Sequence, residues 1–128
     1  MPKRILLVED EDLVRDFLAQ LLTDAGYEVT EAANGQIAML KMSEVGADLA
    51  IIDMLMPVME GAETIFALRR FYPNLKIIAV SGGGLSSAEG HLLIARALGS
   101  QKILTKPLIS TELLEAIREL IGADVSEG

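Results

Sequence analysis

The chain has 128 residues, a length typical of one domain, and contains no cysteine. Nineteen acidic and eleven basic residues give a formal charge of −8, and no cluster of Lys or Arg is present to bind phosphates. This balance argues against direct nucleic-acid binding. The lack of cysteine excludes disulfides, thiolate chemistry and Cys-ligated zinc, and agrees with a reducing compartment.

Apolar runs of four to six residues recur along the chain. They predict five strands, at residues 4–8, 27–32, 49–53, 76–80 and 102–105. The run from Leu49 to Asp53 shows no polar alternation, so both of its faces should be covered, as in the centre of a parallel sheet.

Helical spacing of apolar residues separates these strands. It predicts five helices, at about residues 12–26, 35–46, 61–71, 87–99 and 110–122. Asp12 and Ser110 are expected to cap the first and last helices, and Phe17 falls in the apolar stripe of the first. The alternation predicts an α/β fold, a doubly wound (βα)5 unit with a five-stranded parallel sheet in a flavodoxin-like three-layer sandwich.

The ends of the chain bear on its organisation and location. The first predicted strand begins at Arg4, leaving no room for a signal peptide, and no apolar run approaches the roughly 20 residues that span a bilayer. We therefore expect a cytoplasmic protein without a membrane segment. We also expect one domain over residues 1–122 and a frayed tail over residues 123–128.

Polar residues stand at the ends of four of the predicted strands, and they should meet at one edge of the sheet. These residues are Glu9, Asp10, Asp53, Ser81 and Lys106. Three crowded carboxylates would repel one another unless a hard divalent cation, most simply Mg²⁺, compensated their charge. Asp53 could then attack a phosphoryl group, while a hydroxyl and an ammonium bound its other oxygens.

This pattern, with Val-Glu-Asp-Glu near residue 9, Asp53 before Met56-Pro57, Ser81, and Lys106-Pro107, resembles the response regulator receiver family of two-component signalling. The resemblance covers residues 3 to about 121, so residues 1–122 would form a receiver domain. It implies that Asp53 accepts phosphate, with the protein catalysing its own phosphorylation and dephosphorylation. It further implies that Glu9, Asp10, Asp53 and the Leu55 backbone carbonyl hold Mg²⁺. Ser81 and Lys106 would contact the phosphoryl group.

The resemblance also implies partners. The phosphate donor would be a histidine kinase or a histidine phosphotransfer protein, and the output would be a downstream protein or a linked output domain. A homodimer formed on activation is compatible with the family. The sequence leaves open whether the chain acts alone or as part of a longer regulator or hybrid kinase.

Two features depart from the family pattern. Ile103 stands where receivers commonly carry Tyr or Phe, and Gly82-Gly83-Gly84 lies in a stretch that looks longer than usual. Ile is stiff at its first side-chain torsion and cannot swing as an aromatic switch does. We therefore expect activation to reshape residues 82–91 while Ile103 keeps its rotamer.

Three alternative functions compete with this interpretation. Aspartyl-nucleophile phosphatases also form an aspartyl phosphate, but they usually carry a second acid two residues later, where this chain has Leu55. A flavin or nucleotide domain would need a glycine-rich loop after the first strand, where this chain has four acids. A third alternative keeps the fold as a phosphorylation-independent interaction module.

Overall fold

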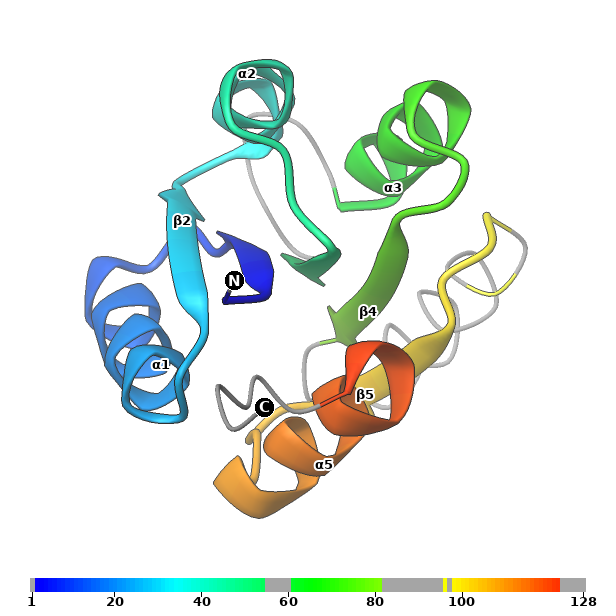
Figure 1. Ribbon diagram of the computed structural model, residues 1–128. Coiled ribbons are helices and arrows are strands. Elements are labelled where there is room, and N and C mark those ends of the chain that lie inside the picture. Colours follow the sequence, from blue (N-terminus) through cyan, green and yellow to red (C-terminus); the bar gives the residue numbers. More distant parts are fainter. Residues whose placement is uncertain (1, 55–60, 82–95, 97, 123–128) are drawn as a thin grey trace.

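The computed structural model describes residues 2–54, 61–81, 96 and 98–122 (Figure 1). Five parallel strands form one sheet in the order β2-β1-β3-β4-β5. Their bounds are β1 Arg4–Val8, β2 Glu28–Ala32, β3 Leu49–Asp53, β4 Lys76–Ser81 and β5 Lys102–Thr105. The predicted sheet is thereby confirmed, with β3 at its centre. The strand order reverses between β1 and β3, the position where doubly wound folds bind ligands.

Among the described residues, helices cover both faces of the sheet (Figure 1). On one side lie α1 (Asp12–Asp24) and α5 (Ser110–Ile121), and on the other α2 (Gly35–Glu44) and α3 (Gly61–Phe71). The helix predicted at residues 87–99 falls almost wholly outside the described residues. None of the described helices has both the length and the apolar composition needed to cross a bilayer.

The central strand shows how the sequence builds two cores. Leu49 and Ile51 pack with α1 and α5, whereas Ala50 and Ile52 pack with α2 and α3. Every residue of β3 is buried, which explains why its sequence shows no polar alternation. Asp53 continues the strand in the register of Leu49 and Ile51, on the α1 and α5 side.

The predicted helix caps were each wrong by one residue. Asp12 and Ser110 are the first helical residues, and the capping positions belong to Glu11 and Ile109, which make no capping hydrogen bond through their side chains. An acidic residue in the first turn still interacts favourably with the helix dipole, so Asp12 keeps part of its expected effect.

The apolar stripe of α1 is rotated from the predicted one. Leu18 and Leu22 are buried, but Phe17 is 60% exposed and Leu13 is 83% exposed. Successive helical residues are rotated by about 100 degrees, so a shift of one position brings Leu22 inward and turns Phe17 toward solvent. The exposed aromatic ring lies on the helix that follows Glu9.

Arg69 at the end of α3 ties together the segments that lead into β4 and β5. Its guanidinium donates to the carbonyls of Pro73 and Leu75 at 2.9 and 2.7 Å and to the carbonyl of Gly99 at 3.0 Å. It also reaches Gln101 Oε1 at 3.2 Å. These bonds fix the start of β5, the strand that carries Lys106 at its far end.

Candidate phosphoacceptor site

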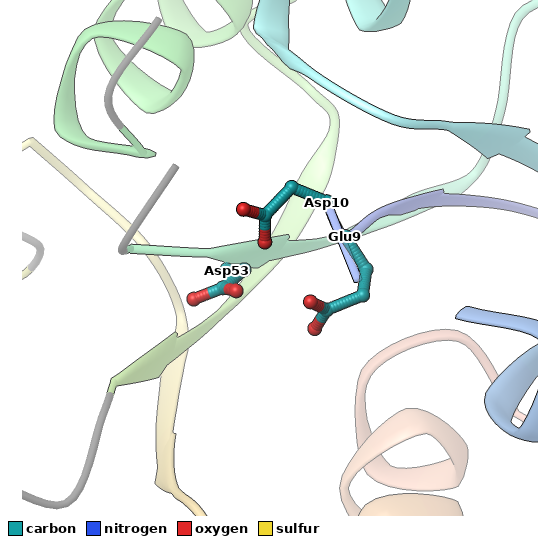
Figure 2. A group of neighbouring side chains, drawn as sticks. All are labelled: Glu9, Asp10 and Asp53. Atoms are coloured by element: carbon teal, nitrogen blue, oxygen red, sulfur yellow. The ribbon is translucent and has the colours of Figure 1, made fainter. Parts of the chain in front are cut away.

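Three carboxylates gather where β1 and β3 end (Figure 2). Val8 pairs with Ile52 in the parallel ladder, so Glu9 and Asp53 emerge beside each other. One carboxylate oxygen from each of Glu9, Asp10 and Asp53 lies within 4.8 Å of the others. Glu9 and Asp53 are each only 3% exposed, whereas Asp10 lies more open to solvent. The sequence prediction of an acidic cluster at this edge is confirmed.

Lys106 supplies the cation of this cluster. Its backbone amide donates to the carbonyl of Ser81 at 2.9 Å, which holds the residue against the end of β4. Its Nζ lies 3.1 Å from Asp53 Oδ2 and 3.4 Å from Glu9 Oε1. One ammonium thus serves two buried carboxylates, and Asp10 adds a third negative group nearby.

The environment shifts the pKa of two of these groups. Burial raises the pKa of Glu9 from 4.5 to about 7, and the charge of Asp53 adds to this effect, although the Glu11 amide and Lys106 oppose it. Burial by itself lowers the pKa of Lys106, but its contacts with Asp53 and Glu9 outweigh burial and raise it. Lys106 therefore stays charged at neutral pH, while Glu9 is poised to titrate there.

Ser81 ends β4 at the same edge. Its predecessor Val80 pairs with Asp53 in the ladder, so the structure places Ser81 one position beyond Asp53 on the neighbouring strand. Ser81 is fully buried, and its Oγ has no hydrogen-bond partner among the described residues. A buried hydroxyl without a partner costs free energy, so a ligand that supplied an acceptor there would be favoured.

Three of the sequence predictions concern the surroundings of the site: the Leu55 carbonyl, residues 82–91 and Ile103. Leu55 and residues 82–91 lie outside the described residues, so the metal contact of the Leu55 carbonyl and the reshaping of that loop stay predictions. Ile103 is described: it pairs with Ala79 and packs, half-buried, against the core on the α2 and α3 side.

An apolar groove opens beside the site, between α1 and the start of α5. It has a volume of about 500 Å³ and is lined by residues that include Val14, Phe17, Lys106, Leu108 and Leu113. Lys106 therefore belongs both to this groove and to the acidic cluster. The rotation of α1 that exposes Phe17 is what gives the groove its aromatic wall.

Gly61, the first residue of α3, borders the site, and the sequence did not predict this. A Cβ placed on it would lie 2.4 Å from the backbone oxygen of Asp53 and 2.4 Å from Cα of Met54. Side-chain movement cannot relieve a contact with backbone atoms. The glycine lets α3 begin directly against the residue that carries the central carboxylate, and a glycine at a predicted helix start was the available signal.

We expect Gly61→Ala to lower the free energy of unfolding by about 1–3 kcal/mol, because the new methyl group must displace α3 from the end of β3. Helix propensity alone predicts the opposite sign, a gain of up to about 1 kcal/mol. Urea unfolding followed by circular dichroism measures this difference. An unchanged or higher stability would show that the close contact has no energetic effect.

The raised pKa of Glu9 makes stability depend on pH. Because folded Glu9 binds its proton more tightly than unfolded Glu9, its favourable contribution is complete below pH 4.5 and is lost as the pH rises through about 7. Glu9→Gln does not titrate, so the variant should gain stability relative to the wild type as the pH rises from 4.5 to 7.

Thermal unfolding of the two proteins in EDTA, at pH values between 5 and 8, measures that difference. A stability difference that stays constant over this range would contradict the assigned pKa.

Comparison with known proteins gives a consistent picture. Residues 5–118 match the family described as response regulator receiver domain. The chain is 34% identical over 121 residues to the chemotaxis protein CheY of Thermotoga maritima, covering 94% of this chain and 98% of that protein. It is 35% identical over 119 residues to the sensor kinase CckA of Brucella abortus, covering 91% of this chain but only 12% of the kinase.

Solved structures agree. A response regulator receiver domain protein (CheY-like) from Methanospirillum hungatei superimposes with a TM-score of 0.87 at 31% identity, covering 93% of each chain. The chemotaxis protein CheY4 of Vibrio cholerae superimposes with a TM-score of 0.86 at 29% identity, covering 94% of this chain and all of that one. With its central carboxylate, acidic neighbours and paired lysine, this chain belongs to the response regulator receiver family.

Proposed function

We propose that this protein accepts a phosphoryl group on Asp53 from a phosphohistidine and uses the change to switch a protein-interaction face. The observation that carries the proposal is the pairing of buried Asp53 with Lys106 at 3.1 Å, beside Glu9 and Asp10, at the central strand's end. In the transfer, the bond from the histidine nitrogen to phosphorus breaks and a bond from an Asp53 oxygen to phosphorus forms.

The donor set fits Mg²⁺. Carboxylate oxygens are the ligands that this ion prefers, and Glu9, Asp10 and Asp53 bring theirs within 4.8 Å of one another. Burial raises the pKa of Glu9, and a bound cation would favour its charged form. These three residues, with the Leu55 carbonyl, would hold the ion, and bound Mg²⁺ would offset the negative charge of the phosphoryl oxygens.

The chain's own residues would orient and stabilise the transferred group. Asp53 supplies the nucleophilic oxygen at the end of the central strand. Lys106 would donate a charged hydrogen bond to a phosphoryl oxygen, and the hydroxyl of Ser81, which has no partner among the described residues, would donate another. The same residues would assist water in hydrolysing the aspartyl phosphate, so the protein catalyses its own phosphorylation and dephosphorylation.

The donor would be a histidine kinase or a histidine phosphotransfer protein, and it would dock in the apolar groove beside Lys106. A phosphohistidine must reach Asp53, so the partner has to contact the surface bordering the acidic cluster. The groove meets this need, since Lys106 lines it and also touches Asp53. Phe17, 60% exposed, offers the large apolar contact typical of an interface centre.

The output of the switch would be contact with a downstream protein or a linked output domain, and activation could also form a homodimer. The chain spans nearly all of CheY but 12% of CckA, so relatives of both organisations exist. We infer a cytoplasmic location, because phosphohistidine is made there from ATP. A phosphorylation-independent interaction module is the competing function, and the labelling experiment below separates the two.

We expect acetyl phosphate with Mg²⁺ to phosphorylate the wild type but not Asp53→Asn. The matched control is Asp48→Asn. Asp48 directly precedes β3 at the end opposite Asp53, and its carboxylate accepts a hydrogen bond from the backbone amide of Arg4. Intact-protein mass spectrometry should show the added phosphoryl mass in the wild type and in the control. Persistent labelling of Asp53→Asn, or none of the wild type, would refute the proposed phosphoacceptor.

A second measurement tests the docking groove. Phe17→Ala should lower kcat/KM for transfer from a histidine kinase by about tenfold, because the groove loses a large apolar contact. Acetyl phosphate needs no docking surface, so its rate should not change. Phe71→Ala is the matched control: it removes an aromatic ring that is 64% exposed at the far end of α3.

The kinase used would be the fastest donor in a panel of purified, phosphorylated histidine kinases. Equal transfer to the wild type, Phe17→Ala and Phe71→Ala would place the docking surface elsewhere.

A further inference from the structure

Arg15 on α1 contacts three separate segments next to the acidic cluster, and its side chain is only 16% exposed. One guanidinium nitrogen donates to the backbone carbonyl of Glu9 at 2.9 Å. Another donates to Asp12 Oδ1 at 2.7 Å, and Nε lies 3.5 Å from Glu31 Oε1 on β2. A single planar group thus connects the β1 end, the start of α1 and the neighbouring strand.

The contact with Glu9 is the one that bears on the site. The backbone amide of Glu9 donates to the carbonyl of Ala32 at 3.1 Å, so the residue is held by β2 on one side and by Arg15 on the other. The carbonyl that Arg15 binds belongs to the peptide unit joining Glu9 to Asp10. Because that unit is planar and rigid, fixing its carbonyl also fixes the direction in which the chain continues to Asp10.

The carboxylate contacts of Arg15 carry less weight. The side chain of Asp12 is 82% exposed and that of Glu31 is 44% exposed, and ion pairs with exposed partners stabilise a fold only weakly. They do hold the guanidinium plane in place. Its fork of donors is matched to several acceptors at once, which a lysine ammonium cannot reproduce.

We propose that Arg15 is a positioning residue of the metal site: it orients the Glu9–Asp10 peptide unit, and so sets how the two carboxylates meet the cation. The inference rests on the proposed function, since it concerns the same Mg²⁺. Residues behind metal ligands commonly act in this way, by fixing the orientation of groups that contact the ion.

The sign of the effect separates positioning from simple electrostatics. Arg15 is a positive charge near a cation site, so its removal should by Coulomb repulsion alone tighten Mg²⁺ binding. Loss of a positioning contact should weaken it. A purely structural role predicts lower stability with unchanged Mg²⁺ affinity.

The chain provides a matched control at the other end of β1. Arg4 also donates to a backbone carbonyl, that of Val45 at 2.9 Å, and also pairs with a carboxylate of β2, that of Glu28 at 3.1 Å. Arg4→Ala therefore removes a comparable pair of bonds at the opposite end of β1 without touching the acidic cluster.

The experiment is a calorimetric Mg²⁺ titration of the wild type, Arg15→Ala, Arg15→Lys and Arg4→Ala, with urea unfolding of each in EDTA. We expect Arg15→Ala to weaken Mg²⁺ affinity by about 10- to 100-fold, with Arg15→Lys between it and the wild type. Arg4→Ala should lose stability and keep its affinity. In phosphorylation by acetyl phosphate, Arg15→Ala should require more Mg²⁺ for half the maximal rate.

Unchanged or tighter Mg²⁺ binding by both Arg15 variants would overturn the positioning role, as would an equal loss of affinity in Arg4→Ala. Arg15→Lys keeps the positive charge, so its Mg²⁺ affinity still tests the positioning role if Arg15→Ala does not fold. The proposed function fails differently: the wild type would then not bind Mg²⁺, or Asp53→Asn would still be phosphorylated.

Discussion

Two buried carboxylates that share one ammonium are the constraint on which this structure depends. Glu9 and Asp53 lie at the ends of neighbouring strands, and Lys106 is within 3.4 Å of both. Burying carboxylates with incomplete compensation is costly, so the surrounding fold must hold them there. The resulting excess of negative charge is also what makes the site suited to a divalent cation, and through it to a phosphoryl group.

The sequence was sufficient for the sheet and for the residues that meet at its edge. The apolar runs at β1, β3 and β4 are continuous because both faces of these strands are covered, and this signal does not depend on distant contacts. Once the strands are parallel, their carboxyl ends must share an edge, so Glu9, Asp53 and Lys106 all lie at that edge.

Features that depend on contacts between distant residues could not be predicted in the same way. The exposure of Phe17 follows from how α1 is rotated on the sheet, and a 3-4 pattern specifies that rotation only to within one residue. The closeness of Gly61 to the Asp53 backbone and the reach of Arg15 to the Glu9 carbonyl arise from packing between segments. No local pattern in the sequence encodes either distance.

The hydrogen bond from the Lys106 amide to the Ser81 carbonyl couples the positions of these two residues. It joins the ends of β4 and β5 at the two residues that would contact a phosphoryl group, while Arg69 clamps the opposite end of β5. Hydrogen bonds therefore hold β5 at both of its ends. Any displacement of Ser81 would be shared by Lys106, so the two side chains would respond to a ligand as one unit.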